Sequence, residues 1–339
     1  MPHASLAPVT RRPVRGRLAL TAACAAVALT AAAAPAALAA DAPKAGATEV
    51  AATTTVGGTP YEADTNTRTH TTYVANSSAK SLSVLDSRTG ALKTTVALDA
   101  SAFGVAVDST TDRVYLTGTT SVTILDGATN KVITTVDYGT KVHGIEVNPE
   151  THQVYAVAPS DDAVLVLDGE TGAQVATASV AADSTPVQVA VDTKNHSYWV
   201  SSTAAGTVTE FDTRTNEVVN TVTTGTNAQN LALDAQRHKL YVDNYGDGTV
   251  AVVNTSAAKV TKTVTVGAKP LGVDVNTETG RVYVGNSGDG TVSVIDGHSD
   301  KVTATVTVGT FPLGVSTDSG AGTTLVANRT DGTVSVLRG

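Results

Sequence analysis

A segment of about 42 residues recurs through most of this chain, and the repeat constrains the fold more than any other feature of the sequence. The stretch PLGVDVN at 270–276 returns as PLGVSTD at 312–318, and GTVSVID at 290–296 echoes GTVAVVN at 248–254. A chain made of such copies folds as a stack or ring of similar units, each of which buries its apolar face against its neighbours.

Two landmarks occur in the same order in successive copies. A tyrosine opens a β-like run at Tyr73, Tyr115, Tyr155, Tyr198, Tyr241 and Tyr283, and Leu325 takes its place in a seventh copy. An acidic or amide residue closes the next run at Asp86, Asp126, Asp168, Asp212, Asn254 and Asp296. Because the tyrosines are spaced by 40 to 43 residues, the pattern predicts seven copies of one structural unit.

Each copy contains four short runs rich in Val, Thr and Tyr. In the sixth copy the predicted strands are residues 271–275, 281–285, 291–295 and 301–308. Glycine-containing turns separate them, and glycine supplies the positive φ that tight hairpins need. No stretch after residue 40 has a helical period. Four-stranded antiparallel units of this length are typical of propeller blades, so the sequence predicts an all-β, seven-bladed β-propeller.

The two ends of the repeat region complement each other. The seventh copy stops after its third strand, whereas an orphan run, EVAATTTVG at 49–57, precedes the first complete copy. This run aligns with the fourth strand of the sixth copy, up to the glycine at 309. We therefore predict that the N-terminal strand completes the last blade and covers an edge that would otherwise be exposed.

The first 40 residues differ from the rest of the chain. They contain four arginines, no acidic residue, and an Ala/Leu/Val-rich run that ends in an A-x-A site at 37–39. This pattern is typical of a secretory signal peptide at 1–40 with cleavage near Ala39 or Ala40, followed by a short linker at 41–48 and the propeller at 49–339. A membrane anchor is the alternative interpretation of the apolar run. We expect a secreted or extracytoplasmic protein with no membrane span after cleavage.

Charge and cysteine content narrow the chemistry of the mature chain. Loss of the four arginines takes the net charge from −8 to −12, so we do not expect nucleic acid as a partner. The only Cys and the only Met lie in the first 40 residues, which leaves no disulfide and no thiol nucleophile. Motifs of serine hydrolases, zinc proteases and nucleotide-binding loops are absent. We therefore predict no catalytic motif, no metal set and no cofactor, in a monomeric protein.

Three segments carry a resemblance to a known family. YVGN at 283–286, YVAN at 73–76 and LVAN at 325–328, each followed by Gly-Thr-Val-Ser-Val or a variant, resemble the YVTN-type β-propeller repeat family. The resemblance covers 49–339 and implies the propeller fold of exported and surface-layer-like proteins. The family is also similar to lactonase-like and quinoprotein-like propellers, so it implies no single activity. No catalytic residue carries over, because the matching motif is structural.

Four histidines occupy one equivalent position, four residues after an Asn or Asp. They are His70, His152, His196 and His238, and the other copies place Asp112, Gly280 and Gly322 there. Because His, Asp and Gly all occur where a residue must adopt positive φ, the pattern favours a turn residue. A shared metal site is the alternative interpretation.

At the beginning of each copy, the residue types at equivalent positions differ more between blades than they do in the rest of the repeat. Recognition residues collect at loops and strand ends on a rigid scaffold, so this variable set is our candidate ligand-binding rim at one mouth of the channel. It consists of Tyr61, Glu62, Asp64, Phe103, His143, Glu146, Gln188, Gln229, Asn230, Asp274 and Phe311. His143 with Glu146 would suit a divalent cation or act as a base, whereas a solvated rim without a ligand is the plainer alternative.

Two functions of different classes follow. The first is an exported binding or protein-interaction propeller, whose partner is an unknown protein or small ligand at one propeller face. The alternative is a propeller enzyme of lactonase-like or lyase-like type that acts at the channel mouth. Both rest on analogy of fold. Two carboxylates and a His that converge on a metal would favour the enzyme, and dispersed rim groups would favour binding.

Overall fold

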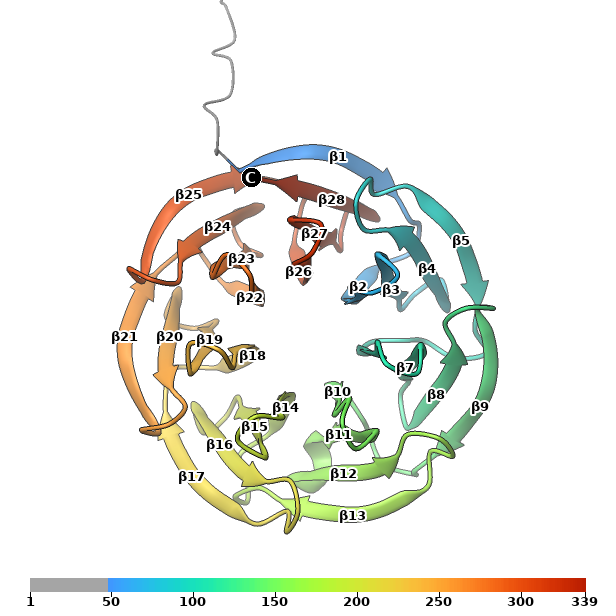
Figure 1. Ribbon diagram of the computed structural model, residues 1–339, viewed down its shortest axis with the longest axis vertical. Helices are drawn as coiled ribbons and strands as arrows, with labels where there is room; N and C mark the ends of the chain where they lie inside the picture. Colours follow the sequence, from blue (N-terminus) through green and yellow to red (C-terminus); the bar gives the residue numbers. More distant parts are fainter. Residues whose placement is uncertain (1–47) are drawn as a thin grey trace, which may run out of the picture. The chain divides into compact units, whose positions relative to one another are not determined.

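The computed structural model describes residues 48–339, which form seven four-stranded antiparallel sheets arranged in a ring (Figure 1). Each sheet is one blade, with its first strand beside the central channel and its last strand on the circumference. The predicted all-β, seven-bladed propeller is therefore confirmed. The predicted signal peptide at 1–40 and all but the last residue of the predicted linker lie outside the described residues.

The first six blades take their strands in chain order from the channel outwards. Blade 1 consists of β2 (Pro60–Asn66), β3 (Thr71–Asn76), β4 (Ser81–Asp86) and β5 (Leu92–Ala97). Blade 2 consists of β6 (Val105–Asp108), β7 (Arg113–Thr117), β8 (Ser121–Asp126) and β9 (Lys131–Asp137). Blade 3 consists of β10 (Ile145–Val147), β11 (Gln153–Ala158), β12 (Ala163–Asp168) and β13 (Gln174–Ser179), with the short helix η1 (Pro159–Asp161) between β11 and β12.

The next three blades have the same arrangement. Blade 4 consists of β14 (Pro186–Asp192), β15 (Ser197–Ser202), β16 (Thr207–Asp212) and β17 (Val218–Thr223). Blade 5 consists of β18 (Ala228–Asp234), β19 (Lys239–Asn244), β20 (Thr249–Asn254) and β21 (Lys259–Thr265). Blade 6 consists of β22 (Pro270–Asn276), β23 (Arg281–Asn286), β24 (Thr291–Asp296) and β25 (Lys301–Thr307). Within residues 48–339, no helix is long and apolar enough to cross a membrane.

Blade 7 combines strands from both ends of the described chain. It consists of β26 (Pro312–Asp318), β27 (Thr323–Asn328), β28 (Thr333–Arg338) and β1 (Glu49–Thr55). β1 pairs antiparallel with β28 and forms the outer strand of the blade (Figure 1). The N–H groups of Val56 and Gly57 extend this contact by donating to the carbonyl of Gly332, at 3.0 and 3.2 Å. The N-terminal strand therefore completes the last blade, as the sequence predicts.

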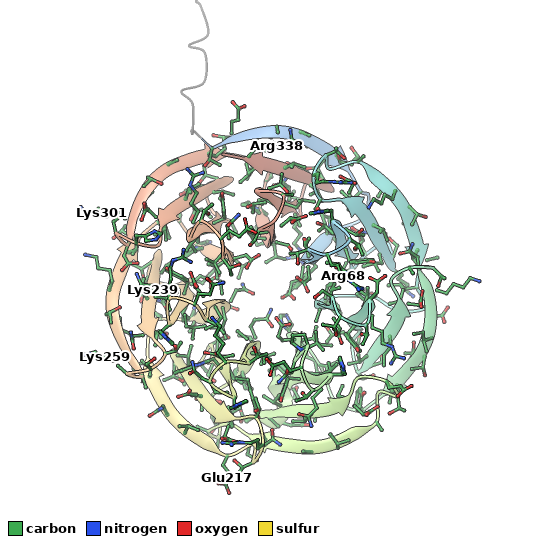
Figure 2. The ribbon with its side chains drawn as sticks, viewed as in Figure 1. Arg68, Glu217, Lys239, Lys259, Lys301 and Arg338 are labelled. Atoms are coloured by element: carbon green, nitrogen blue, oxygen red, sulfur yellow. The ribbon has the colours of Figure 1, made fainter. Side chains whose placement is uncertain are left out.

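Hydrophobic side chains fill the spaces between adjacent blades. Tyr73 and Val84 of blade 1, for example, pack in one buried cluster with Val114 and Leu116 of blade 2. Burial of one such aliphatic side chain contributes about 1.5–3 kcal/mol, so the blades stabilise one another across the ring. The outer strands consist mostly of exposed residues, and Figure 2 shows charged side chains such as Lys259 and Lys301 pointing outwards from the circumference.

The tyrosine of the repeat joins neighbouring blades. The hydroxyl of Tyr73 donates to the carbonyl of Gly127 at 3.2 Å, and that of Tyr115 donates to the carbonyl of Gly169 at 3.0 Å. In both cases the acceptor lies in the turn between the third and fourth strands of the next blade. The repeated tyrosine therefore has a structural role.

Blade 4 departs from the predicted landmark by one residue. Trp199 lies opposite Ala190, just as Tyr73 lies opposite Asp64 in blade 1. The assignment of Tyr198 to the tyrosine position is therefore wrong, because the indole of the fully buried Trp199 occupies that place. Tyr198 instead stacks on the ring of Phe211, with centroids 5.0 Å apart.

The histidine turns have the backbone conformation that the repeat predicts. The φ angles of His70, His152, His196 and His238 lie between 52° and 59°, and Asp112, Gly280 and Gly322 are also positive. Two of the histidines connect blades as well, because Nδ1 of His152 lies 2.7 Å from Oδ2 of Asp108 and Nδ1 of His70 lies 2.7 Å from Oδ2 of Asp318. In residues 48–339, no three His, Cys, Asp or Glu side chains are placed to hold a metal ion.

Candidate binding site in the central channel

The inner strands run between two faces of the ring. The upper face carries the connections between blades, and the lower face carries the turn that follows each inner strand. Equivalent residues of the seven inner strands therefore form rings around the channel. The middle ring lies opposite the tyrosine position in every blade and consists of Asp64, Ala106, Glu146, Ala190, Ala232, Asp274 and Ser316. The upper ring, two residues earlier, consists of Glu62, Gly104, Gly144, Gln188, Asn230, Gly272 and Gly314.

Both rings break the sevenfold repetition. Each has three large polar side chains, and its other members are Gly, Ala or Ser. The glycines have a packing role, because a Cβ on Gly272 would collide with the carbonyl oxygen of Leu313 in the next blade, and one on Gly314 would lie 2.6 Å from the carbonyl oxygen of Tyr61. Close approach of some inner strands is thus combined with a few polar groups that extend into the channel.

Three cavities follow the channel and share walls. The mouth cavity, about 250 Å³, lies at the upper face and shares Glu62, Gln188 and Asn230 with a middle cavity of about 110 Å³. The middle cavity in turn shares Asp64, Glu146 and Asp274 with a lower cavity of about 450 Å³. The shared residues make the three cavities one passage, and its smallest part lies at the two rings. Pockets for drug-sized ligands are about 300–1,000 Å³, so the mouth and middle cavities suit a slender ligand.

Two aspartates of the middle ring connect adjacent inner strands. Asp64 accepts hydrogen bonds from the backbone N–H of Thr65 at 2.7 Å and of Val107, in the next blade, at 2.8 Å. Asp274 repeats this arrangement with Val275 at 2.8 Å and Thr317 at 2.7 Å. Both carboxylate oxygens of each aspartate are thus occupied by backbone donors.

Asp243 is a third aspartate that connects adjacent inner strands, and it is not among the residues predicted from the sequence. It lies on β19, is fully buried, and accepts hydrogen bonds from the backbone N–H groups of Asn230 at 3.0 Å and Gly272 at 2.8 Å. It therefore connects the inner strands of blades 5 and 6.

The two glutamates of the channel are less completely bonded. Glu62 accepts a hydrogen bond from Nε2 of Gln188 at 3.1 Å. Oε1 of Glu146 accepts one from the N–H of Val147 at 2.8 Å, and its other oxygen has no hydrogen-bond partner within residues 48–339. None of the ion pairs of this part of the chain includes a carboxylate of the channel. Charges that are largely removed from water are normally paired in proteins, so these carboxylates, which are half-buried or buried and have no cationic partner, form an unusual group.

Burial raises the pKa of every carboxyl group in the channel. It raises the pKa of Glu62, Glu146 and Asp243 to about 7 and that of Asp274 to about 6, and the pKa of Asp64 also lies well above its ordinary value. Hydrogen bonds from neighbouring donors act in the opposite direction for each group. Repulsion from Glu146 and Asp274 further raises the pKa of Asp64, so the acidic side chains of blades 1, 3 and 6 act on one another across the channel.

The mouth contains a neutral histidine held by two hydrogen bonds. Nδ1 of His143 lies 3.2 Å from the carbonyl oxygen of Val187, which can only accept, so this nitrogen donates. Nε2 is then the acceptor for the hydroxyl of Tyr61 at 3.3 Å. Burial lowers the pKa of His143 below its ordinary value, which favours this neutral form.

Aromatic and basic side chains surround the mouth. The ring of Tyr61 packs edge-on against Phe103, with centroids 5.4 Å apart. The guanidinium of Arg329 lies 5.3 Å from the centroid of Tyr61 and 5.6 Å from that of Phe311. These rings fix the position of Tyr61 at the cavity wall.

The candidate residues chosen from sequence separate into three groups. Tyr61, Glu62, His143, Gln188, Gln229 and Asn230 line the mouth cavity. Asp64, Glu146 and Asp274 lie deeper, where the middle and lower cavities meet. Phe103 and Phe311 pack at the rim and are not among the residues that line the channel cavities.

Tyr245, Leu271 and Leu313 also line the mouth, and sequence reasoning missed them together with Asp243 and Arg329. A signal existed for three of these residues. The copy YVDNY at 241–245 has Asp and Tyr where YVGNS at 283–287 has Gly and Ser, and LVANR at 325–329 ends in Arg at the same place. A residue that departs from the repeat in a single copy therefore indicates a position at or near the mouth of the channel.

Comparison with known proteins identifies the fold and no family. No family model and no curated protein sequence matches the chain. Among solved structures, hydrazine synthase from Kuenenia stuttgartiensis is similar, with a TM-score of 0.73 and 17% sequence identity over 83% of this chain and 96% of that one. The likeness shows a shared propeller fold alone. The resemblance to YVTN-type repeats stays a prediction.

The class of protein that these observations define is a seven-bladed β-propeller with an asymmetric, acidic channel. The large polar groups of its two rings are half-buried, and they line a passage that begins at the upper face. Such a site can bind a ligand through hydrogen bonds and charge, and carboxyl groups with a pKa near 7 can also exchange protons near neutral pH.

Proposed function

We propose that this protein is an exported binding propeller, which holds a small ligand or a projecting group of a partner protein at the upper mouth of its channel. The observation that carries the proposal is the loss of repeat symmetry at the two rings. Gln188, Asn230 and the acidic residues replace Gly or Ala at these places, and their side chains line one continuous passage.

Rigidity of the site supports binding. Tyr61 is held by His143, Phe103 and Arg329, and Gln188 bonds both Glu62 and the backbone N–H of Val189, at 3.1 and 3.0 Å. Groups that are fixed before a ligand arrives lose little conformational entropy on binding. The proposed export rests on the arginine-rich and alanine-rich pattern of residues 1–40.

A thermal-shift screen tests the proposed function. The purified protein is scanned with separate sets of amines, carboxylates, sugars, nucleotides and divalent cations. A His143→Phe, Gln229→Leu double variant, which replaces two polar groups of the mouth with apolar ones, is scanned in parallel. We expect at least one set to raise the Tm of the wild-type protein and to leave the double variant unchanged. Ligands that stabilise both proteins equally would place binding elsewhere and contradict the proposal.

Catalysis at the channel mouth is the second candidate, and one observation favours it. Glu62 and Glu146 have pKa values raised to about 7, which suits a general acid or base. The lactonase-like form of this proposal would require a bound metal ion as well. Turnover of lactone or ester substrates that is lost in Glu62→Gln, with binding retained, would favour the enzyme.

A further inference from the structure

The passage through the upper and middle rings has the charge distribution of a site for an elongated cation. Glu62 lies in the wall that the mouth and middle cavities share, and Glu146 lies in the wall between the middle and lower cavities. The two rings are two residues apart along each inner strand, which corresponds to about 7 Å along an extended strand. Carboxylates are thus present at two levels of one narrow channel.

Positive charge that would neutralise these carboxylates is nearly absent from the walls. The lining of the mouth cavity contains only the neutral His143, the lining of the middle cavity contains no basic residue, and Lys194 lines the far, lower cavity. Arg329 and Lys269 lie beside the mouth, each against an aromatic ring of its wall, but neither is among the residues that line the cavity. A buried carboxylate is costly unless a cation or several donors compensate it. The incompletely bonded glutamates of the two levels therefore favour a ligand that carries positive charge into the channel.

The walls indicate an organic cation and not a metal ion. Leu271, Leu313, Val187 and the ring of Tyr245 line the mouth, and Val105, Ile145 and Leu231 line the middle cavity. Methylene groups pack favourably against such surfaces, which a metal ion does not use. Within residues 48–339, no three side chains of His, Cys, Asp or Glu are placed to hold a metal ion.

We propose that the channel binds a linear diamine, with one ammonium group at Glu62 and the other at the middle ring beside Glu146. The carbon chain lies in the narrow part of the passage between the two levels. Gln188, which already bonds Glu62, keeps that carboxylate directed along the wall. The inference rests on the proposed binding function and names its ligand class.

Isothermal titration calorimetry with 1,5-diaminopentane tests the proposal on the purified protein at pH 8. The matched probes are pentylamine, which has one ammonium group, 1,3-diaminopropane, which is too short to reach both levels, and 1,5-pentanediol, which has no charge. We expect the five-carbon diamine to bind at least tenfold more tightly than the two amine controls, and the diol to give no heat. Equal affinity for pentylamine or for the short diamine would overturn the two-level site.

Two isosteric variants test whether each of the two glutamates binds an ammonium group of the diamine. Glu62→Gln and Glu146→Gln should each weaken diamine binding at least tenfold, and each should fold because it removes a half-buried charge that has no cationic partner. Glu170→Gln is the control, since that side chain is 80% exposed in a turn of blade 3 and should bind like the wild type. Diamine binding that all three variants retain, and that added salt abolishes, would reflect general attraction to an acidic surface and would overturn the proposal.

The dependence of affinity on pH gives an independent readout. Protonation of the channel carboxyls competes with the diamine, so the affinity should fall at least fivefold between pH 8 and pH 5.5 in the wild-type protein. Affinity that does not change with pH would contradict binding at these groups. If the amines fail but another ligand set binds at the mouth in the thermal-shift screen, the diamine is rejected and the binding function is retained.

Discussion

Asp108 and Glu146 lie on inner strands of adjacent blades, and their surroundings give them opposite acid strengths. Asp108 ends β6, where burial raises its pKa but hydrogen bonds from Thr110, His152 and Thr111 outweigh that effect and lower it. Its oxygens lie 2.8 Å from the backbone nitrogen of Thr110 and 2.7 Å from Nδ1 of His152. Glu146 lies within β10 and accepts a single hydrogen bond, so burial raises its pKa to about 7.

The comparison separates the framework of the propeller from its site. Every inner strand ends in Asn or Asp or is followed directly by one. In Asn66, Asp108 and Asp318 these side chains are occupied by turns and by the next blade. The middle ring has an acidic residue in only three blades. Asp108 has no exposed surface and Glu146 is half-buried, yet the more buried group has the lower pKa, so the number of hydrogen-bond donors around each carboxylate decides its role.

The largest effect is expected from removing the strand that closes the ring. Deletion of residues 49–57 would expose the edge of β28 and remove Val56, which packs with Val74 and Leu85. Burial of one Val contributes about 1.5–3 kcal/mol, and a domain has about 5–15 kcal/mol of total stability. We expect a much lower Tm and aggregation, measured by differential scanning calorimetry and light scattering.

A circular permutant is the control for that deletion. A chain that starts at Pro312 and joins Gly339 to residue 48 makes blade 7 continuous, and it should fold with a Tm near that of the parent. Unchanged melting after the deletion itself would show that the framework does not depend on β1.

The framework side of the comparison is tested by Asp108→Ala. This change leaves the N–H of Thr110 and the imidazole of His152 without their acceptor, so we expect a loss of about 2–4 kcal/mol in the free energy of unfolding. Asp108→Asn keeps one acceptor oxygen and should lose about half as much. Urea denaturation at pH 7 measures both, and a neutral Asp108→Ala variant would mean that the turn does not need its carboxylate.

The channel side of the comparison is tested by Glu146→Gln, which we expect to stabilise the protein, whereas Asp108→Ala should destabilise it. A carboxyl group with a raised folded-state pKa contributes stability that is fully present below about pH 4.5 and is lost as the pH rises through about 7. The variant should therefore be more stable than the wild type at pH 8, by about 1–3 kcal/mol, and nearly equal to it at pH 4.5.

Other groups titrate over the same range, so the difference between variant and wild type is the quantity to measure. Glu62, Asp64, Asp243 and Asp274 have raised pKa values and act in the same direction as Glu146. His143 has a lowered pKa and acts in the opposite direction below pH 6.5. A difference that does not depend on pH would contradict the assignment to Glu146.

The smallest effect is expected at the exposed histidine turns. His196→Asn keeps the positive φ, which Asn tolerates, and should change the free energy of unfolding by less than about 0.5 kcal/mol. His152→Asn removes the contact with Asp108 and should cost more. Equal losses of unfolding free energy in both variants, measured by urea denaturation, would mean that the contact between the imidazole of His152 and Asp108 adds no stability beyond that of the turn.

The repeat predicts the fold because each blade uses the same local rules. Turn residues, strand lengths and the orphan run at 49–57 are all visible in one dimension, so blade number and ring closure follow from the sequence. The error at Tyr198 arises because blade 4 has adjacent aromatic residues, and only strand pairing shows that Trp199 occupies the repeated place.

The site is less accessible to the same reasoning. Variation at the start of each copy identifies Glu62 and Glu146, but it does not reveal that one lies a level above the other or that their carboxylates lack ion-pair partners. Asp243 and Tyr245 belong to a different strand segment, and they approach the channel only when the blades assemble. The depth of each carboxylate in the channel, and whether a cation lies beside it, are decided only when the seven blades close into a ring.

The pairing of β1 with β28 also orders the events of folding. Blades 1 to 6 form from strands that are neighbours along the chain, whereas β1 must find a partner at the opposite end of the described sequence. Contacts between such distant segments are slow to form, because a long loop must close first. During synthesis β1 leaves the ribosome before every other strand of the propeller and its partner β28 leaves last, so the edge of blade 7 stays exposed until the ring is complete.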